Sequence, residues 1–218
     1  MDTKQACRLL PLCLLIISVS ACGLVLTQYG PLSLDKAILL WFRDGQDQVK
    51  LAGPVWMTQF WLSVSWLGDT TPRLFSAGLG ITLLLCLRRW QSALFLTGVL
   101  LSGISLSTLI KAWVARPRPG LVPHLDQVSS MSFPSGHALN STLFYLALAL
   151  VLAPLLKEHS TKCGLYGFAL VSSLAIGLSR IALGVHWPSD VLASWMIAYG
   201  WLALWGIVAK HYWPRVFA

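Results

Sequence analysis

The 218-residue sequence has few charged side chains and no paired-cysteine motif, and both deficits exclude common classes of protein. Only 11% of the residues are charged, whereas soluble domains average about 25%. A water-soluble globule, a disordered chain and a nucleic-acid-binding protein are therefore poorly supported. The five cysteines form no C-x-x-C pair, so we interpret them as small buried hydrophobic residues.

The sequence is rich instead in long hydrophobic runs. Residues of the types AVILMFWYC make up 56% of the chain, which is more than one small core can bury. Stretches of about 20 apolar residues, the length of a membrane-crossing helix, alternate with short polar breaks. We predict an all-α polytopic membrane bundle of six transmembrane helices in a single domain, residues 1–218. The approximate spans are 9–27, 72–88, 93–113, 138–156, 164–183 and 191–209.

The segment between the first two predicted spans combines charged residues with a tryptophan-rich run over residues 51–67. Trp56, Phe60 and Trp61 are spaced to share one face of a helix. Aromatic residues anchor helices at the membrane surface, so we predict an interfacial helix in this first outer loop. A seventh crossing is the alternative interpretation.

The first span resembles a secretory signal, with a lipoprotein-like cleavage box that ends at Cys22. Because the apolar run continues past this box, a retained span is favoured over cleavage. Basic residues flank the span ends in four short segments that share one side: Lys4 and Arg8, Arg88 and Arg89, Lys157 and Lys162, Lys210 and Arg215. The positive-inside rule then places both termini in the cytoplasm and the other face outside the plasma (inner) membrane.

Three polar clusters stand at predicted span ends, where charges raise the free energy unless they have a partner or a function. The first contains Lys111, Arg116 and Arg118, the second is the Pro-Ser-Gly-His sequence of residues 134–137, and the third covers residues 179–190. Because the fourth and fifth spans cross the bilayer out and back, all three clusters meet on one face. Several cations beside histidines predict a pocket for a multiply charged anion such as phosphate.

Local signals in the second and third clusters agree with a phosphate site. Ser135 suits the N-cap of the fourth span, and free backbone N–H groups at a helix N-terminus bind anions. Pro188 suits the first position of the sixth span, which places Asp190 in its first turn and within reach of His186. An aspartate that accepts from one ring nitrogen leaves the other as a nucleophile, and His137 is then left to act as an acid.

Together the clusters resemble the three-part signature of the type 2 phosphatidic acid phosphatase family, the membrane lipid phosphate phosphatases. The family pattern is K-x6-R-P, then P-S-G-H, then S-R-x5-H-x3-D, and this sequence matches it in spacing and order. The matching residues are Lys111, Arg118 and Pro119, then Pro134 to His137, then Ser179, Arg180, His186 and Asp190. Arg116 belongs to a second Arg-Pro pair outside the pattern and is either an auxiliary group or a surface charge.

The resemblance implies a metal-independent phosphoryl transfer through a phosphohistidine, without a cofactor. By the family pattern, His186 attacks phosphorus, Asp190 orients it, and His137 protonates the departing oxygen. The groups expected to hold the phosphate oxygens are Lys111, Arg118, Ser135, the Gly136 amide and Arg180. The residues themselves also disfavour a metal, because Asp190 is the only acid within the motifs and three cations repel a divalent ion.

The expected substrate is a lipid phosphate or diphosphate in the bilayer, and undecaprenyl diphosphate is preferred because an outer-face site in a compact chain suits recycling of a lipid carrier. Phosphatidylglycerol phosphate, phosphatidic acid and lipid A phosphates present the same anion and stay as alternatives, as does phosphate transfer to another lipid. A serine hydrolase using Ser135 lacks the G-x-S-x-G motif. A non-enzymatic anion-binding or transport protein has no need of an oriented histidine, and six spans disfavour a soluble vanadate-dependent peroxidase. The oligomeric state is not predicted.

Taken singly, several of these residues have structural interpretations. Lys111 and Arg180 suit charges that extend from span ends towards lipid headgroups. Outside the motifs, Asp126 is expected to occupy a solvated loop or interface position, and Asp69 is expected to pair with Arg73 at the start of the second span.

Overall fold

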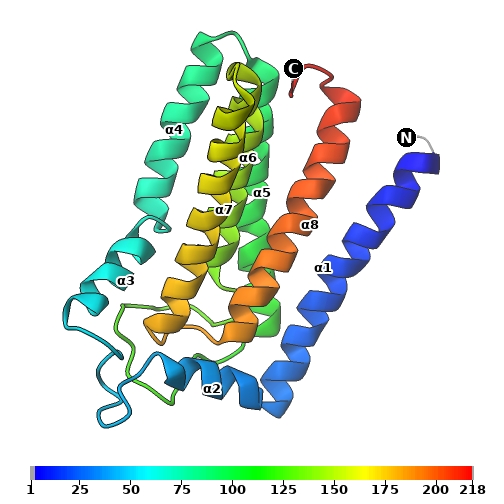
Figure 1. The fold of residues 1–218 in the computed structure, drawn as a ribbon. Helices are drawn as coiled ribbons and strands as arrows, with labels where there is room; N and C mark the ends of the chain where they lie inside the picture. The colour runs from blue at the N-terminus through cyan, green and yellow to red at the C-terminus, as the bar shows by residue number, and fades with distance from the viewer. Residues whose placement is uncertain (1–2, 218) are drawn as a thin grey trace.

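The computed structural model describes residues 3–217, with side chains described from residue 9 onward. Long helices run side by side, and two shorter helices lie towards the end of the bundle remote from both termini (Figure 1). The helices are α1 (Thr3–Tyr29), α2 (Ser33–Trp41), α3 (Trp56–Trp66), α4 (Thr70–Cys86), α5 (Trp90–Val114), α6 (Gly136–Leu152), α7 (His159–Ala182) and α8 (Pro188–Tyr212). A 3-10 turn, η1 (Ala153–Leu155), extends α6.

Five helices in the described part of the chain are long and apolar enough to cross a bilayer. They are Leu9–Tyr29, Trp90–Val114, Gly136–Leu155, His159–Ala182 and Pro188–Tyr212. The remaining predicted span, residues 72–88, corresponds to α4, whose 17 residues extend about 26 Å against a hydrocarbon thickness of about 30 Å. The sixth crossing therefore stays a prediction.

The tryptophan-rich run forms α3, which has 11 residues and is about 17 Å long. This length is too short for the alternative of a seventh crossing, whereas the interfacial position of α3 stays a prediction. The sequence analysis did not predict α2, a nine-residue helix that begins four residues after α1 ends.

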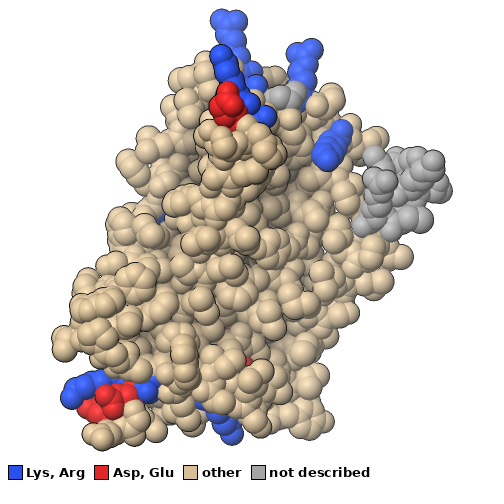
Figure 2. Space-filling model, viewed as in Figure 1, with Lys and Arg blue, Asp and Glu red and all other residues tan. Residues whose placement is uncertain are grey.

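The outer surface has the charge distribution that a bilayer requires. In Figure 2, Lys and Arg side chains gather at the two ends of the molecule, and the wall between the ends is almost free of charge. Cys13, Cys22, Cys86 and Cys163 are exposed on the protein surface, so the prediction that the cysteines are buried is wrong for these four. Small apolar side chains are also tolerated where a helix faces lipid, and composition alone does not distinguish the two environments.

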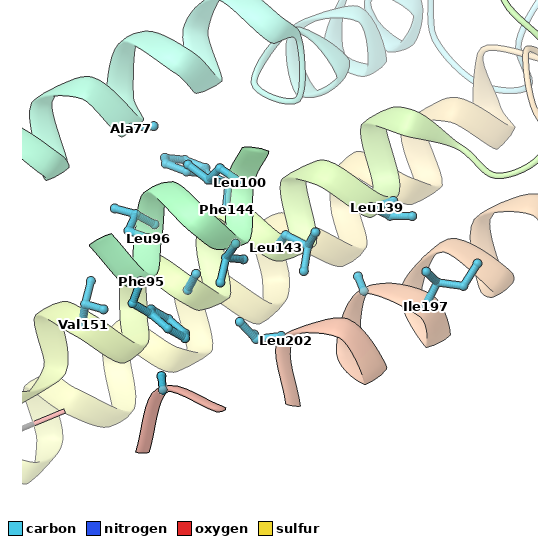
Figure 3. Close-up of a cluster of buried hydrophobic side chains, with 14 of the residues drawn as sticks. Ala77, Phe95, Leu96, Leu100, Leu139, Leu143, Phe144, Val151, Ile197 and Leu202 are labelled. Carbon is cyan, nitrogen blue, oxygen red and sulfur yellow. The ribbon is translucent and has the colours of Figure 1, made fainter. Parts of the chain in front are cut away.

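The main core lies between α5, α6 and α8 (Figure 3). Phe95, Leu143 and Ile197, one from each helix, are fully buried there. Gly103 lets α5 approach α6 closely, because a Cβ at this position would collide with the side chain of Leu143. This packing holds the end of α5 beside the first turns of α6 and α8, which are the segments that carry the three polar clusters.

Candidate active site

The last turn of α5 brings the first cluster against the second. Lys111 Nζ donates to the Met131 carbonyl at 2.5 Å, in the loop that leads to the Pro-Ser-Gly-His sequence. A Cβ built on Gly136 would lie 3.7 Å from Lys111 Cε. Gly136 is the first residue of α6, so the ammonium of Lys111 stands beside the N-terminus of that helix.

Ser135 occupies the N-cap of α6, as the sequence predicted. Its side-chain oxygen accepts from the Ala138 N–H at 3.4 Å, and the residue is fully buried. This geometry explains why α6 begins here, because the cap satisfies one of the backbone donors that a helix leaves free. The remaining donors of the first turn are the groups expected to bind an anion.

His137 has a partner that the sequence did not indicate. Its Nε2 lies 2.6 Å from Asp69 Oδ1, and Asp69 is the N-cap residue of α4. The expected pairing of Asp69 with Arg73 is wrong, since the Arg73 guanidinium donates instead to the Gly68 carbonyl at 2.7 Å. Asp69 is therefore available to orient the imidazole of His137.

The third cluster has the predicted arrangement at the start of α8. Pro188 is its first residue, and Asp190 in the first turn accepts from the Trp187 N–H at 3.0 Å. His186 is 1% exposed, and its Nδ1 lies 3.7 Å from Asp190 Oδ2. Asp190 thus lies beside Nδ1 of His186, and Nε2 of the same ring stays free for another partner.

Ser132 lies between this aspartate and this histidine. Its hydroxyl donates to Asp190 Oδ2 at 2.5 Å and is 3.4 Å from His186 Nδ1. A hydroxyl can accept from one neighbour while it donates to another, so Ser132 links the imidazole to the carboxylate. The sequence analysis missed this residue.

The other ring nitrogen of His186 faces Arg118, whose Nη1 lies 3.2 Å from Nε2. A guanidinium carries only donors, so Nε2 must present its lone pair and the ring proton resides on Nδ1. Arg118 is held in place by the Val185 and Ser130 carbonyls, at 2.6 and 2.7 Å. This assignment leaves Nε2 unprotonated on the side where the cations gather.

Cations of the first and third clusters act on the imidazole of His186. Burial, followed by the charges of Arg118, Arg180 and Lys111, lowers the pKa of His186 well below its usual value. Burial and the neighbouring charge of Arg180 also lower the pKa of Arg118, to about 10, so its guanidinium stays charged at neutral pH. The pocket therefore combines a neutral imidazole with fixed positive charge.

Arg180 is buried, and its guanidinium has hydrogen-bond partners for only some of its N–H groups. It is 1% exposed and donates to Asp126 Oδ2 at 2.5 Å and to the Ser65 hydroxyl. Asp126 is partly exposed in its loop, but it also pairs with this buried cation, which the sequence did not indicate. Among the described residues, Arg180 Nε finds no acceptor, and a buried N–H of this kind calls for an oxygen from a ligand or from water.

Arg116 is buried and pairs with two carboxylates, so its interpretation as a surface charge is wrong. It is 1% exposed, with Nη1 2.6 Å from Asp190 Oδ1 and Nη2 3.3 Å from Asp35 Oδ2. Asp35 in α2 also accepts from the Ser189 N–H and hydroxyl, at 2.8 and 2.7 Å. The guanidinium thus joins α2 to the start of α8 and holds the carboxylate that faces His186.

Two cavities adjoin this region and share Trp66 in their linings. One of about 360 Å³ has mixed walls, in which Asp69, Asp126 and Ser65 are polar and Leu62 is apolar. The other, of about 330 Å³, has mainly apolar walls from α3, α4 and α6, including Phe75.

No group of three or more His, Cys, Asp and Glu side chains within the described residues is placed to hold a metal ion. The carboxylates near the pocket already have cationic or imidazole partners: Asp69 with His137, Asp126 with Arg180, and Asp190 with Arg116. Metal independence stays a prediction, which a chelation experiment can test.

Comparison with known proteins decides the family. The model described as "PAP2 superfamily" matches residues 91–213, more than half of the chain and the range that holds all three clusters. The chain belongs to the PAP2 superfamily. This result confirms the resemblance that the motif spacing indicated.

Relatives of this PAP2 protein include phosphatases of several lipids. Phosphatidylglycerophosphatase B of Bacillus subtilis (strain 168) is 38% identical over 95 residues, which cover 42% of this chain and 45% of that protein. Lipid A 1-phosphatase of Rhizobium etli is 31% identical over 125 residues, which cover 53% and 48%. The PAP2 chain spans about half the length of the curated relatives it matches.

A solved structure matches almost the whole PAP2 chain. It is the crystal structure of a transmembrane PAP2-type phosphatidylglycerolphosphate phosphatase from Bacillus subtilis, with a TM-score of 0.75 and 26% identity. The alignment covers 94% of this chain and 96% of that one. Together with the five helices of spanning length, this likeness identifies a multi-pass membrane protein.

Proposed function

We propose that this PAP2 protein hydrolyses the phosphate or diphosphate group of a membrane lipid. The observation that carries the proposal is the position of His186, a neutral buried imidazole whose pKa is lowered by burial and by Arg118, Arg180 and Lys111. Positioned cations stabilise the charge that spreads over the phosphoryl oxygens in the transition state. A nucleophile at the centre of such a pocket is the arrangement that phosphoryl transfer requires.

In the first step, the lone pair of His186 Nε2 attacks phosphorus. A P–N bond forms as the bond to the leaving oxygen breaks, and His137 gives its proton to that oxygen. Asp190, directly and through Ser132, stabilises the positive charge that develops on the imidazole. In the second step, His137 takes a proton from water, whose oxygen attacks phosphorus; phosphate departs and Nε2 regains its lone pair.

The phosphate oxygens have donors from all three clusters. Lys111, Arg118 and the unpaired Nε of Arg180 supply the charge. Ser135 and the Gly136 amide supply neutral donors at the start of α6, where the helix dipole favours an anion.

In the proposed topology, the single domain 1–218 crosses the plasma membrane six times. The sixth crossing is α4, since a helix a few ångströms short is accommodated by local thinning of the bilayer. The helices α2 and α3 lie at the interface of the outer face, both termini are cytoplasmic, and the active site is on the outer face. The support is the positive-inside bias and the position of α2 and α3 at the end remote from the termini (Figure 1).

Undecaprenyl diphosphate is the substrate that we propose first, because an outer-face site suits the recycling of a lipid carrier. Phosphatidylglycerol phosphate is the second candidate, since the structural neighbour that covers 94% of the chain is named for that activity. For either lipid, the phosphate would lie among Lys111, Arg118 and Arg180, and the apolar cavity beside Trp66 would take the chain.

A phosphate-release panel tests this proposal. Purified protein is given undecaprenyl diphosphate, phosphatidylglycerol phosphate, phosphatidic acid and lipid A, first without added metal and then with EDTA. We expect the highest kcat/KM for undecaprenyl diphosphate and no change with EDTA. Failure to release phosphate from any of the four lipids contradicts the proposed reaction, and loss of activity with EDTA contradicts its metal independence.

The pH dependence of activity gives a prediction about Arg118. His186 attacks only when unprotonated, so its lowered pKa places the acid limb of kcat/KM well below the ordinary histidine value of about 6.5. Replacing Arg118 by Gln removes one of the charges that lower this pKa, and the acid limb should move to higher pH. Arg118→Lys keeps the charge, so its limb should not move, although both variants should lower kcat/KM by about 100-fold. Identical limbs in the wild type and in Arg118→Gln would contradict this account of the pocket.

A second prediction concerns Asp69, which we assign as the residue that positions His137. Asp69→Ala should lower kcat by about 10- to 100-fold on a lipid phosphate, with little change in KM. The loss should largely disappear with p-nitrophenyl phosphate, whose leaving group departs with little need for an acid. An equal loss on both substrates would show that Asp69 does not act through proton donation by His137.

A further inference from the structure

A larger cavity lies at the opposite end of the bundle from the candidate active site. Its volume is about 1070 Å³, and it is lined by the end of α6, the first half of α7 and the last half of α8. The candidate active site uses the other ends of these helices. On α8, Asp190 and Lys210 are 20 residues apart, about 30 Å along the axis, which is the thickness of the hydrocarbon core.

The lining of this cavity is basic at its rim and apolar in its walls. Lys162 and Lys210 project from α7 and α8, and Leu202 and Ile207 belong to the apolar wall. None of the described residues that line the cavity is acidic. Within residues 9–217, neither lysine has a carboxylate within 4.0 Å, and the ammonium of Lys210 lies instead 6.0 Å from the ring of Phe217.

One aromatic hydroxyl group, that of Tyr166, lies near the basic rim. Tyr166 on α7 lines the cavity one turn from Lys162, whereas Tyr199 lies about 16 Å along α8 from Lys210 and belongs to the deeper wall. Tyrosine and lysine together suit the membrane interface, where the ring contacts chains and the polar tip reaches the headgroups. Basic pockets between membrane helices bind the phosphate of anionic lipids.

We propose that this cavity binds one anionic phospholipid from the leaflet opposite the candidate active site. Its phosphodiester lies between Lys162 and Lys210, and its acyl chains follow Leu202 and Ile207 towards the bilayer centre. The lipid is a ligand and not a substrate, because the cavity is a membrane thickness away from His186. The proposal does not depend on the reaction that the other site performs.

Lipid binding to the purified full-length protein tests this proposal by native mass spectrometry in detergent. Phosphatidylglycerol is the anionic probe, and phosphatidylcholine with the same chains is the neutral one. The wild type should prefer phosphatidylglycerol, and the double variant Lys162→Gln/Lys210→Gln should bind it roughly 30-fold more weakly. The matched control is Lys157→Gln, which removes a lysine at the same end but outside the cavity lining and should bind as the wild type does. Unchanged phosphatidylglycerol binding in the double variant overturns the proposal.

A second variant fills the cavity without changing its charge. Gly206 lines the cavity, and a Cβ built there meets no atom within 4 Å, so a larger side chain has room to enter. Gly206→Trp should therefore reduce phosphatidylglycerol binding at least about tenfold, since a bulky ring occupies the space for the chains. Glycerol 1-phosphate, the soluble headgroup, should not compete at millimolar concentration. Competition by glycerol 1-phosphate together with normal lipid binding by Gly206→Trp would show a site for free anions and overturn the lipid assignment.

Discussion

Replacing His186 with Gln is expected to lower phosphate release by about 10⁴-fold or more, because it removes the imidazole that forms the proposed covalent intermediate. The side chain of His186 is buried, and its Nε2 presents a lone pair to the cationic side of the pocket. Arg118, Arg180 and Lys111 would still bind phosphate in this variant. The loss should therefore appear in kcat, with substrate binding largely kept.

The protein should stay folded after this substitution. Gln is close to His in volume and offers polar atoms to Ser132 and Arg118, and Asp190 keeps its bonds to Arg116 and to the Trp187 amide. The control is His137→Gln, which removes the proposed acid and should cost about 10²- to 10⁴-fold. Retention of most turnover by a folded His186→Gln protein would contradict the proposed nucleophile.

Replacing Arg116 with Gln is expected to lower the free energy of unfolding by about 3 to 5 kcal/mol, the largest stability effect that the structure suggests. Arg116 is the shared partner of two carboxylates, Asp35 and Asp190, which are 2% and 0% exposed. Without the guanidinium, two negative charges remain buried with no cation bonded to them. Activity should also fall, because Asp190 is then held less firmly beside His186.

The measurement for this prediction is the unfolding midpoint in a fixed detergent, by thermal or denaturant titration. Arg118→Gln is the matched control, since Arg118 is only partly buried and bonds to carbonyl groups rather than to a carboxylate. Its midpoint should move much less. Asp35→Asn should lie between the two, because it removes one buried charge and keeps the shape of the group. An Arg116→Gln protein that unfolds at the wild-type midpoint would rule out a structural role for this buried triad.

The long helices could be predicted because each transmembrane span is recognised from the length of its own hydrophobic run. Counting the crossings then tells on which face of the membrane each connecting loop lies. Each predicted span corresponds to an observed helix, with α4 shorter than a full crossing. The convergence of Lys111, Arg118 and His186 likewise needed only the rule that two crossings return the chain to the same face. The family pattern then distinguished Arg118 from Arg116, which composition could not do.

The partners of these residues could not be predicted, because they are fixed by packing between distant segments. Asp35 is 81 residues from Arg116, and Asp69 is 68 residues from His137. From the sequence, Asp35 could be placed only in an outer loop and Asp69 only at the end of a span. No periodicity within one helix indicates which carboxylate will meet a cation from another helix.

Ser132 shows a different limit. It lies two residues before the Pro-Ser-Gly-His sequence, in a loop without helical periodicity, and its fully buried position depends on how residues 130–135 fold over α8. A serine adjoining a motif has no property in the sequence that separates it from its neighbours at 129 and 130. Only the 2.5 Å contact with Asp190 identifies it.

The most direct test of the proposed chemistry is to locate the phosphoryl group on the protein during turnover. A lipid phosphate labelled with ³²P is mixed with the protein for milliseconds, the reaction is stopped in alkali, in which a P–N bond survives, and the labelled peptide is sequenced by mass spectrometry. The label should lie on His186 and should be absent from His186→Gln. A label on Ser135, or turnover without any labelled peptide, would contradict the mechanism.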